Sequence, residues 1–232
     1  MNPLWKIYKK FPYFEYRHRI VARLPHQGSL LELGSSTGEF ARLFKFMRPD
    51  VQVTAVDIKD FSEAVGAEIP FVVADITNGL PKDFEERFDC VTTMHLFEHL
   101  NPESCEAVAR EIKRVLKPGG VWYIETPGLR SLFFPSFSFG RARYSCPMNF
   151  YDDPSHVKPF TQGGLFYLMN NAGFVVKCTG AARNRLFTLC SPVLVLVGLL
   201  TGKRLWLAVG LFNLFGWAVF GHGTKADESA NS

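Results

Sequence analysis

Apolar positions between residues 29 and 179 alternate between short continuous runs and helical spacing. The runs that predict strands lie at residues 29–33, 51–56, 70–74, 88–94, 121–126 and 174–179. Apolar residues three and four positions apart predict helices at 39–47 and 105–116, and a further helix follows Thr161, the expected N-cap, to about residue 171. Short strands that alternate with helices are typical of an α/β fold with a mostly parallel sheet.

Residues 1–27 form a basic and aromatic N-terminal segment. Six lysines and arginines stand there against one acid, Glu15, and residues 16–24 predict a short helix that ends at Pro25. Two interpretations stay open: a solvated helix face, or a surface that attracts an anionic lipid or substrate. The main domain is then expected over residues 28–185.

Residues 127–160 interrupt the alternation. They contain six phenylalanines and the basic pair Arg141 and Arg143, and no regular period is visible. A stretch of this length without periodicity is typical of a functional insertion or a lid. We expect an aromatic substrate insertion before the sixth strand.

The C-terminal part contains two uncharged runs, residues 186–201 and 205–220. Each has 16 residues, fewer than the roughly 20 that a helix needs to cross a bilayer. We therefore predict an apolar helical hairpin within residues 186–223, with a possible last strand. Two roles stay open for residues 187–220: contact with a membrane surface, or a homodimer interface. Residues 224–232 are expected to be a disordered tail.

Composition sets few further limits. The chain has 232 residues, 47% hydrophobic and 21% charged, which is ordinary for a globular protein of one or two domains. A net charge of +4 without a basic stripe beyond residues 1–24 gives no reason to expect a nucleic-acid partner. Five cysteines without a CxxC pair, and no signal-peptide pattern, favour a reduced cytoplasmic compartment.

The sequence Gly34-Ser35-Ser36-Thr37-Gly38 follows the first strand directly, and a helix begins after it. A dinucleotide-binding turn would need a third glycine where Glu39 stands, and that carboxylate would repel a pyrophosphate. A hydrolase elbow would make Ser36 a nucleophile, with Asp152 or Asp153 and His156 later in the chain. That elbow lies in mid-sheet, however, whereas only 28 residues precede this strand.

The third interpretation comes from a resemblance. Glu32, Gly34 and Gly38 stand where the first motif of the class I S-adenosylmethionine-dependent methyltransferases has an acid and two glycines, and Ser36 replaces the middle glycine. The resemblance covers about residues 28–180. It implies a Rossmann-like sheet with helices on both faces, and S-adenosylmethionine as methyl donor. The run Asp152–Thr161 is similar to a segment common in bacterial methyltransferases found with polysaccharide and lipid-linked glycan assembly.

The resemblance also implies a set of cofactor contacts. Asp57, at the end of the second strand, would accept both ribose hydroxyls, and Asp75, at the end of the third, would bind the adenine amino group. Ile58 and Ile76 would flank the adenine ring. The end of the fourth strand adds Met94 and His95 to the expected cofactor site. A turn or helix cap is the alternative role for each strand-end aspartate.

Candidates for proton transfer from the acceptor are His95, Glu98, His99 and His156, and we favour His156, with Asp153 orienting it. His95 and Glu98 complete a His-x-x-Glu-His match to inverted zinc proteases, which the strand-to-helix context disfavours. Glu98, His99 and His156 are also similar to a divalent-ion segment of some quinone and small-RNA methyltransferases. We favour pocket-lining residues without a metal.

Three functions remain. The first is O-methylation of a glycan or lipid-linked intermediate by a protein on the inner face of the cytoplasmic membrane. The second is methylation of a prenylated quinone or another small hydrophobic acceptor. The third is a non-catalytic interaction protein, which the Ser36 departure motivates.

Overall fold

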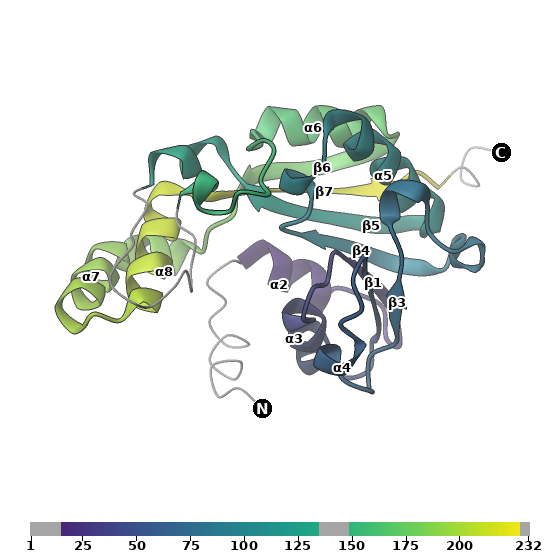
Figure 1. Cartoon of the computed structure of the whole chain (residues 1–232), viewed down its shortest axis with the longest axis horizontal. Helices are drawn as coiled ribbons and strands as arrows, with labels where there is room; N and C mark the ends of the chain where they lie inside the picture. Colours follow the sequence, from purple (N-terminus) through teal and green to yellow (C-terminus); the bar gives the residue numbers. More distant parts are fainter. Residues whose placement is uncertain (1–14, 135–148, 228–232) are drawn as a thin grey trace.

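The computed structural model describes residues 15–134 and 149–227, which form one seven-stranded sheet in the order β3-β2-β1-β4-β5-β7-β6 (Figure 1). The strands are β1 (Ser29–Leu33), β2 (Gln52–Asp57), β3 (Phe71–Val73), β4 (Phe88–Met94), β5 (Leu116–Pro127), β6 (Phe174–Ala181) and β7 (Ala218–Lys225). The first five are parallel, and β7 runs antiparallel to both β5 and β6. The expected Rossmann-like, mostly parallel fold is confirmed.

Helices cover both faces of this sheet. Helices α5 (Pro102–Val115) and α6 (Gln162–Asn171) lie on one face, and α2 (Glu15–Ala22), α3 (Glu39–Met47) and α4 (Ser62–Val65) on the other (Figure 1). Short 3-10 helices occupy the connections: η1 (Ile76–Asn78), η2 (Lys82–Phe84), η3 (Phe97–His99), η4 (Leu129–Phe133) and η5 (Phe150–Asp152). Each face has its own hydrophobic core, one including Phe44 of α3 and the other Ile112 of α5. Burial of such a side chain contributes about 1.5–3 kcal/mol.

Local chemistry explains where the elements begin and end. Helix α5 starts three residues before the predicted Cys105, because Asn101 Oδ1 accepts a 2.8 Å hydrogen bond from the Ser104 N–H and Pro102 suits the first turn. Thr161 caps α6 as predicted. Strand β5 begins at Leu116, five residues before the predicted start, so Lys117–Gly120 is part of the strand rather than a loop before it.

The apolar C-terminal runs form α7 (Arg185–Thr201) and α8 (Arg204–Phe215), which lie together at one end of the sheet (Figure 1). Their backbones approach closely at glycines. A Cβ on Gly198 would lie 2.6 Å from the Leu207 nitrogen, and one on Gly210 would lie 2.9 Å from Val195 Cγ2. Among the described residues, no helix combines the length and the apolar character needed to span a membrane.

Parts of three predicted segments lie outside the residues that the structure describes. These parts are residues 1–14 of the N-terminal segment, 135–148 of the aromatic insertion and 228–232 of the tail. The tail prediction is wrong at its start. Thr224 and Lys225 belong to β7, where Thr224 lies between Val121 of β5 and Val175 of β6.

Candidate cofactor and acceptor site

The carboxyl ends of β1, β2 and β3 lie along one edge of the sheet. The parallel register pairs Leu33 with Val56, and Asp57 with Val73. Glu32, Asp57 and Asp75 therefore lie at or just beyond the carboxyl ends of three neighbouring strands at the same edge, which is where ligands bind in open α/β sheets.

The turn after β1 has a backbone conformation that favours glycine. Gly34 and Gly38 have φ angles of 70° and 74°, and the helix α3 begins directly after Gly38. A Cβ on Gly38 would lie 2.6 Å from Val65 Cγ2, and one on Gly34 would lie 2.8 Å from Leu96 Cδ1. Ser36, at φ 46°, adopts the same left-handed region with a side chain. The turn is thus narrow and leaves its backbone accessible at an exposed serine.

Glu32 is a buried acid, 1% exposed. Neither of its carboxylate oxygens has a hydrogen-bond partner in the described part of the chain. Burial raises its pKa to about 8, although the nearby backbone N–H of Ala41 and the guanidinium of Arg17 oppose the rise. A buried carboxylate without a partner is costly, and a cationic ligand group at this edge would remove that cost.

The other two strand-end acids differ from each other. Asp57 Oδ2 accepts a 2.8 Å hydrogen bond from the Ser36 N–H, and Oδ1 accepts one from the backbone N–H of Lys59 at 3.1 Å. Asp75 caps η1 by accepting from the N–H and hydroxyl of Thr77 and from Asn78. The hydroxyl of Thr77 is the main cause that lowers the Asp75 pKa. The capping alternative therefore holds for Asp75.

The remaining expected cofactor contacts fall into two groups, exposed and buried. Ile58 is 63% exposed beside Asp57, whereas Ile76 and Met94 are buried in the two cores. His95 follows β4 with a φ of 55°, and its N–H donates to the carbonyl of Glu125 at 2.9 Å. Its Nδ1 lies 3.4 Å from Glu98 Oε1. Ile58 and His95 are thus the members of this set whose side chains reach the surface of the edge.

A buried ion pair lies beside His95, whose Nε2 is 3.7 Å from Glu125 Oε1. Arg17 of α2 is 2% exposed, and its guanidinium donates to both oxygens of Glu125, with Nε at 3.2 Å. The Tyr123 hydroxyl donates to Glu125 at 2.8 Å, and Arg17 also lies over the Phe40 ring, 4.8 Å from its centre. Both sequence interpretations of this helix place its cations at the surface, and for Arg17 they are wrong. The signal was Glu125 itself, a lone acid in an otherwise apolar strand that needs a cation when buried.

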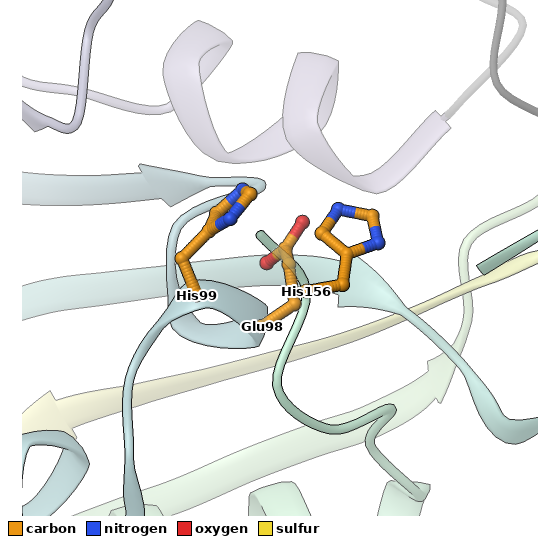
Figure 2. Close-up of side chains that lie close together, drawn as sticks. All are labelled: Glu98, His99 and His156. Atoms are coloured by element: carbon orange, nitrogen blue, oxygen red, sulfur yellow. The ribbon is translucent and has the colours of Figure 1, made fainter. Parts of the chain in front are cut away.

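The acceptor-side candidates form one cluster. Figure 2 shows Glu98 between His99 and His156, and one ligand atom from each of the three lies within 4.8 Å of the others. Glu98 is fully buried and accepts a 2.9 Å hydrogen bond from the Thr126 hydroxyl. The N–H of Val157 donates to the Glu98 carbonyl at 2.7 Å, which holds the His156 segment against η3.

Each histidine of the cluster is fixed through Nδ1. His99 Nδ1 lies 2.9 Å from the Ser155 hydroxyl oxygen, and His156 Nδ1 lies 2.6 Å from the Phe150 carbonyl. Asp153 Oδ1 accepts from the Ser155 hydroxyl, and Oδ2 lies 3.9 Å from His156 Nε2. Partial burial raises the Asp153 pKa, but the hydrogen bonds from the hydroxyl and N–H of Ser155, together with the electrostatic attraction of His156 and His99, outweigh it and leave the pKa below its ordinary value. Ser155 is the member of this network that sequence reasoning missed.

Comparison with known proteins identifies the family. A family model described as "Methyltransferase domain" matches residues 5–179, which is most of the chain. The chain belongs to this methyltransferase family. The motif at Glu32–Gly38 and the cluster around Glu98 both lie within the matched residues.

Individual relatives of this methyltransferase agree on the family and the fold. It is 33% identical over 143 residues to the ubiquinone/menaquinone biosynthesis C-methyltransferase UbiE of Desulfotalea psychrophila, an alignment that covers 57% of this chain and 56% of that protein. The chain thus spans about half the length of that relative.

Two solved structures share the fold of this methyltransferase. An S-adenosylmethionine-dependent methyltransferase from Archaeoglobus fulgidus is 20% identical with a TM-score of 0.62, covering 95% of this chain and 94% of that one. Phosphoethanolamine N-methyltransferase 2 of Haemonchus contortus, in complex with S-adenosylmethionine, is 16% identical with a TM-score of 0.60 and covers 90% and 51%.

S-adenosylmethionine is the methyl donor of this family, and the edge of the sheet fits it. The donor carries an amine and a sulfonium, both cationic, and Glu32 offers a buried carboxylate without a hydrogen-bond partner in the described chain. The accessible turn at Ser36 suits close approach of a ligand to backbone. The carboxylate and two imidazoles of the cluster are also a donor set that a divalent transition metal accepts.

Proposed function

We propose that this chain is an S-adenosylmethionine-dependent O-methyltransferase that acts on a glycan or a lipid-linked intermediate. The observation that carries the proposal is the unpartnered carboxylate of Glu32 at the glycine turn, on the same sheet edge as a cluster of two histidines. The first feature suits the donor, and the second suits an acceptor hydroxyl that must lose a proton.

The cofactor residues divide by the part of the donor they contact. Glu32 binds the amine, the turn gives backbone contact, and Asp57 binds the ribose hydroxyls while the backbone N–H groups of Ser36 and Lys59 hold its carboxylate in place. The proposed contacts are Glu32, Gly34, Ser36, Gly38, Asp57, Ile58 and His95, whereas Asp75 caps η1 and Ile76 and Met94 pack in the two cores. The sulfonium of the donor supplies an activated methyl group, so the chain mainly aligns the acceptor with it.

On the acceptor side, His156 removes the proton of the acceptor hydroxyl, and His99 assists this proton transfer. The Phe150 carbonyl holds Nδ1 of His156, which leaves Nε2 as the proton acceptor. Asp153 faces that Nε2 at 3.9 Å and also holds His99 through Ser155. Asp153 is in this arrangement a positioning residue that stabilises the charged imidazole.

The proposed place of action is the inner face of the cytoplasmic membrane. Several large apolar side chains of α7 are exposed, among them Leu189 at 80% and Leu200 at 78%. Exposed apolar surface of this kind marks contact with a membrane or another protein, and α7 and α8 would provide the peripheral contact, whereas residues 218–220 of the predicted 187–220 segment are buried in β7.

A second candidate acceptor is a prenylated quinone or another small hydrophobic molecule. It is supported by the 33% identity to a quinone C-methyltransferase. The two candidates differ in product, because the first gives a methyl ether and the second gives a methyl group on ring carbon.

Calorimetric titration with S-adenosylhomocysteine tests the cofactor site first. Binding at micromolar concentration is expected, and no heat at several hundred micromolar would favour the non-catalytic alternative. Mass spectrometry of envelope glycans, lipids and quinones from cells with and without the gene then identifies the methyl group that is lost. The variant His156→Gln is the matched control, because it should bind S-adenosylhomocysteine normally and leave the acceptor unmethylated.

A further inference from the structure

An apolar cavity of about 560 Å³ lies between η4 and the α7–α8 pair. Its wall includes Phe134, Val195, Leu199 and Leu211, and its one charged member is Arg130. The volume falls in the range of pockets that hold small ligands, roughly 300–1,000 Å³. A wall of this composition suits a hydrocarbon chain, with a single polar position where the chain ends.

Two arginines lie at the turn after α8: Arg130, which lines this cavity, and Arg183, which lines a neighbouring hollow with Glu15 and Arg19. Arg130 Nη1 donates to the Phe215 carbonyl at 3.0 Å. Arg183 packs on the neighbouring Gly216, where a Cβ would come within 2.5 Å of Nη2. Neither guanidinium has a carboxylate within ion-pair distance in the described ranges, and Arg183 Nε is buried without a hydrogen-bond partner there.

The two cations also repel each other. Burial is the main cause that lowers the pKa of Arg183, and the charge of Arg130 lowers it further. Two nearby guanidiniums that lack an acid are typical of an anion site, since the planar fork of arginine fits phosphate with two hydrogen bonds.

Aromatic contacts connect the cavity with the proposed methyl-transfer site. The Phe134 ring, in the cavity wall, lies 5.8 Å from Phe212, which stacks on Trp217 at 4.8 Å. Trp217 lies 5.6 Å from the His95 ring. Arg130 itself is three residues beyond the end of β5, the strand that carries Glu125 at the same edge.

We propose that this cavity binds the hydrocarbon chain of a phosphorylated amphiphile and that Arg130 and Arg183 bind its phosphate. The inference rests on the proposed function and narrows its acceptor to the lipid-phosphate class. The phosphate would lie at the cavity mouth, so that the rest of the head group extends toward the sheet edge where His95 and the histidine cluster lie.

Calorimetry on the full chain with dodecyl phosphate, kept below its micelle concentration, tests the pocket. We expect dodecyl phosphate to bind with micromolar affinity, dodecanol about tenfold more weakly, and inorganic phosphate not measurably. If dodecanol binds as tightly as dodecyl phosphate, the proposed phosphate site is wrong. If inorganic phosphate binds as tightly as dodecyl phosphate, the hydrocarbon chain plays no part in binding.

Two neighbouring residues of α7 give a matched pair. Leu199 and Leu200 are both exposed, at 63% and 78%, but only Leu199 lines the cavity. Leu199→Asp should weaken dodecyl phosphate about tenfold or more, because the carboxylate enters an apolar wall and repels phosphate, whereas Leu200→Asp should change it less than twofold. If both variants lose the same affinity, the hydrocarbon chain binds to a general apolar surface and the pocket proposal is wrong.

The head site has its own pair of variants. Arg130→Gln should weaken dodecyl phosphate about tenfold and leave dodecanol unchanged, and the exposed Arg185→Gln is the control. Vesicles with and without anionic lipid separate a free amphiphile from a bilayer. If Leu199→Asp and Leu200→Asp both abolish vesicle binding while dodecyl phosphate does not bind, the surface contacts membrane and the pocket proposal fails.

The two proposals fail separately. A protein that binds S-adenosylhomocysteine but not dodecyl phosphate keeps the proposed function and loses this inference. A protein that binds dodecyl phosphate but not S-adenosylhomocysteine has the pocket without the methyltransferase activity. Thermal melting of each variant confirms that a lost affinity does not come from lost folding.

Discussion

The backbone N–H of Ser36 donates a 2.8 Å hydrogen bond to Oδ2 of Asp57, 21 residues further along the chain. The bond ties the turn after β1 to the end of β2. A carboxylate offers about four acceptor positions, and the two hydrogen bonds to Asp57 use two of them. The acid is therefore fixed in position and can still accept from ribose hydroxyls.

Replacement of Ser36 by glycine should leave cofactor binding intact. The contribution of Ser36 to the turn is its backbone N–H, and φ 46° is more favourable for glycine than for serine. We expect S-adenosylhomocysteine affinity within about twofold of wild type and a stability change below about 1 kcal/mol. Calorimetry and thermal melting measure both.

Gly38→Ala is the contrast for that variant. Its φ of 74° strains a side chain, and the new Cβ would lie 2.6 Å from Val65 Cγ2. We expect a loss of about 1–3 kcal/mol in stability and at least about tenfold in affinity. An active Gly38→Ala together with an inactive Ser36→Gly would instead favour the nucleophile interpretation of Ser36.

Glu32 should make the free protein sensitive to pH. The folded protein holds the proton up to about pH 8, whereas the unfolded chain loses it near 4.5. The folded state thus binds more protons between these values, and its stability falls as the pH rises through them. Binding of the donor amine needs the carboxylate, so S-adenosylhomocysteine affinity should rise between pH 6 and 8.

Glu32→Gln separates these two effects. It should lower the affinity at least about tenfold and remove its pH dependence, yet raise the stability of the free protein at pH 8 by about 1–3 kcal/mol. The exposed Glu63→Gln, on α4, is the control and should change neither quantity. Unchanged affinity in Glu32→Gln would contradict the assignment of the amine to this residue.

The sequence indicated the fold well because its signals are local. The runs at 29–33 and 88–94 and the helix at 39–47 match the structure to the residue. The antiparallel placement of β7 between β5 and β6 depends on long-range pairing, for which residues 218–225 carry no local signal.

The site was predictable where one segment carries the chemistry. Glu32 and the turn lie within seven residues, so the motif is visible in the sequence. The hydrogen bond between Ser155 and His99 joins residues 56 apart, and the Arg17–Glu125 pair joins residues 108 apart. Such pairs form only because the tertiary structure brings distant segments together, so neither residue type nor spacing in the sequence indicates them.

The buried Arg17–Glu125 pair predicts that the stability effects of substitutions at these two residues are strongly coupled. Removing one partner leaves a buried charge alone, so Arg17→Met and Glu125→Gln should each cost about 3–5 kcal/mol. The double variant should lose less than the sum of the two, with a coupling of about 2 kcal/mol or more. Urea unfolding of the four proteins measures this cycle, and simple additivity would mean that the pair contributes little.

The Glu98, His99 and His156 cluster predicts how activity responds to a chelator. If His156 acts as the base, EDTA should leave the turnover rate unchanged, and His156→Gln should lower it about 100-fold or more with little effect on cofactor affinity. The exposed Glu63→Gln again serves as the control. Loss of activity in EDTA with recovery on adding Mn²⁺ or Zn²⁺ would instead assign the cluster to a metal. In that case Glu98→Gln and His99→Gln should abolish the recovery, because each provides one of the three ligand atoms that lie within 4.8 Å of one another.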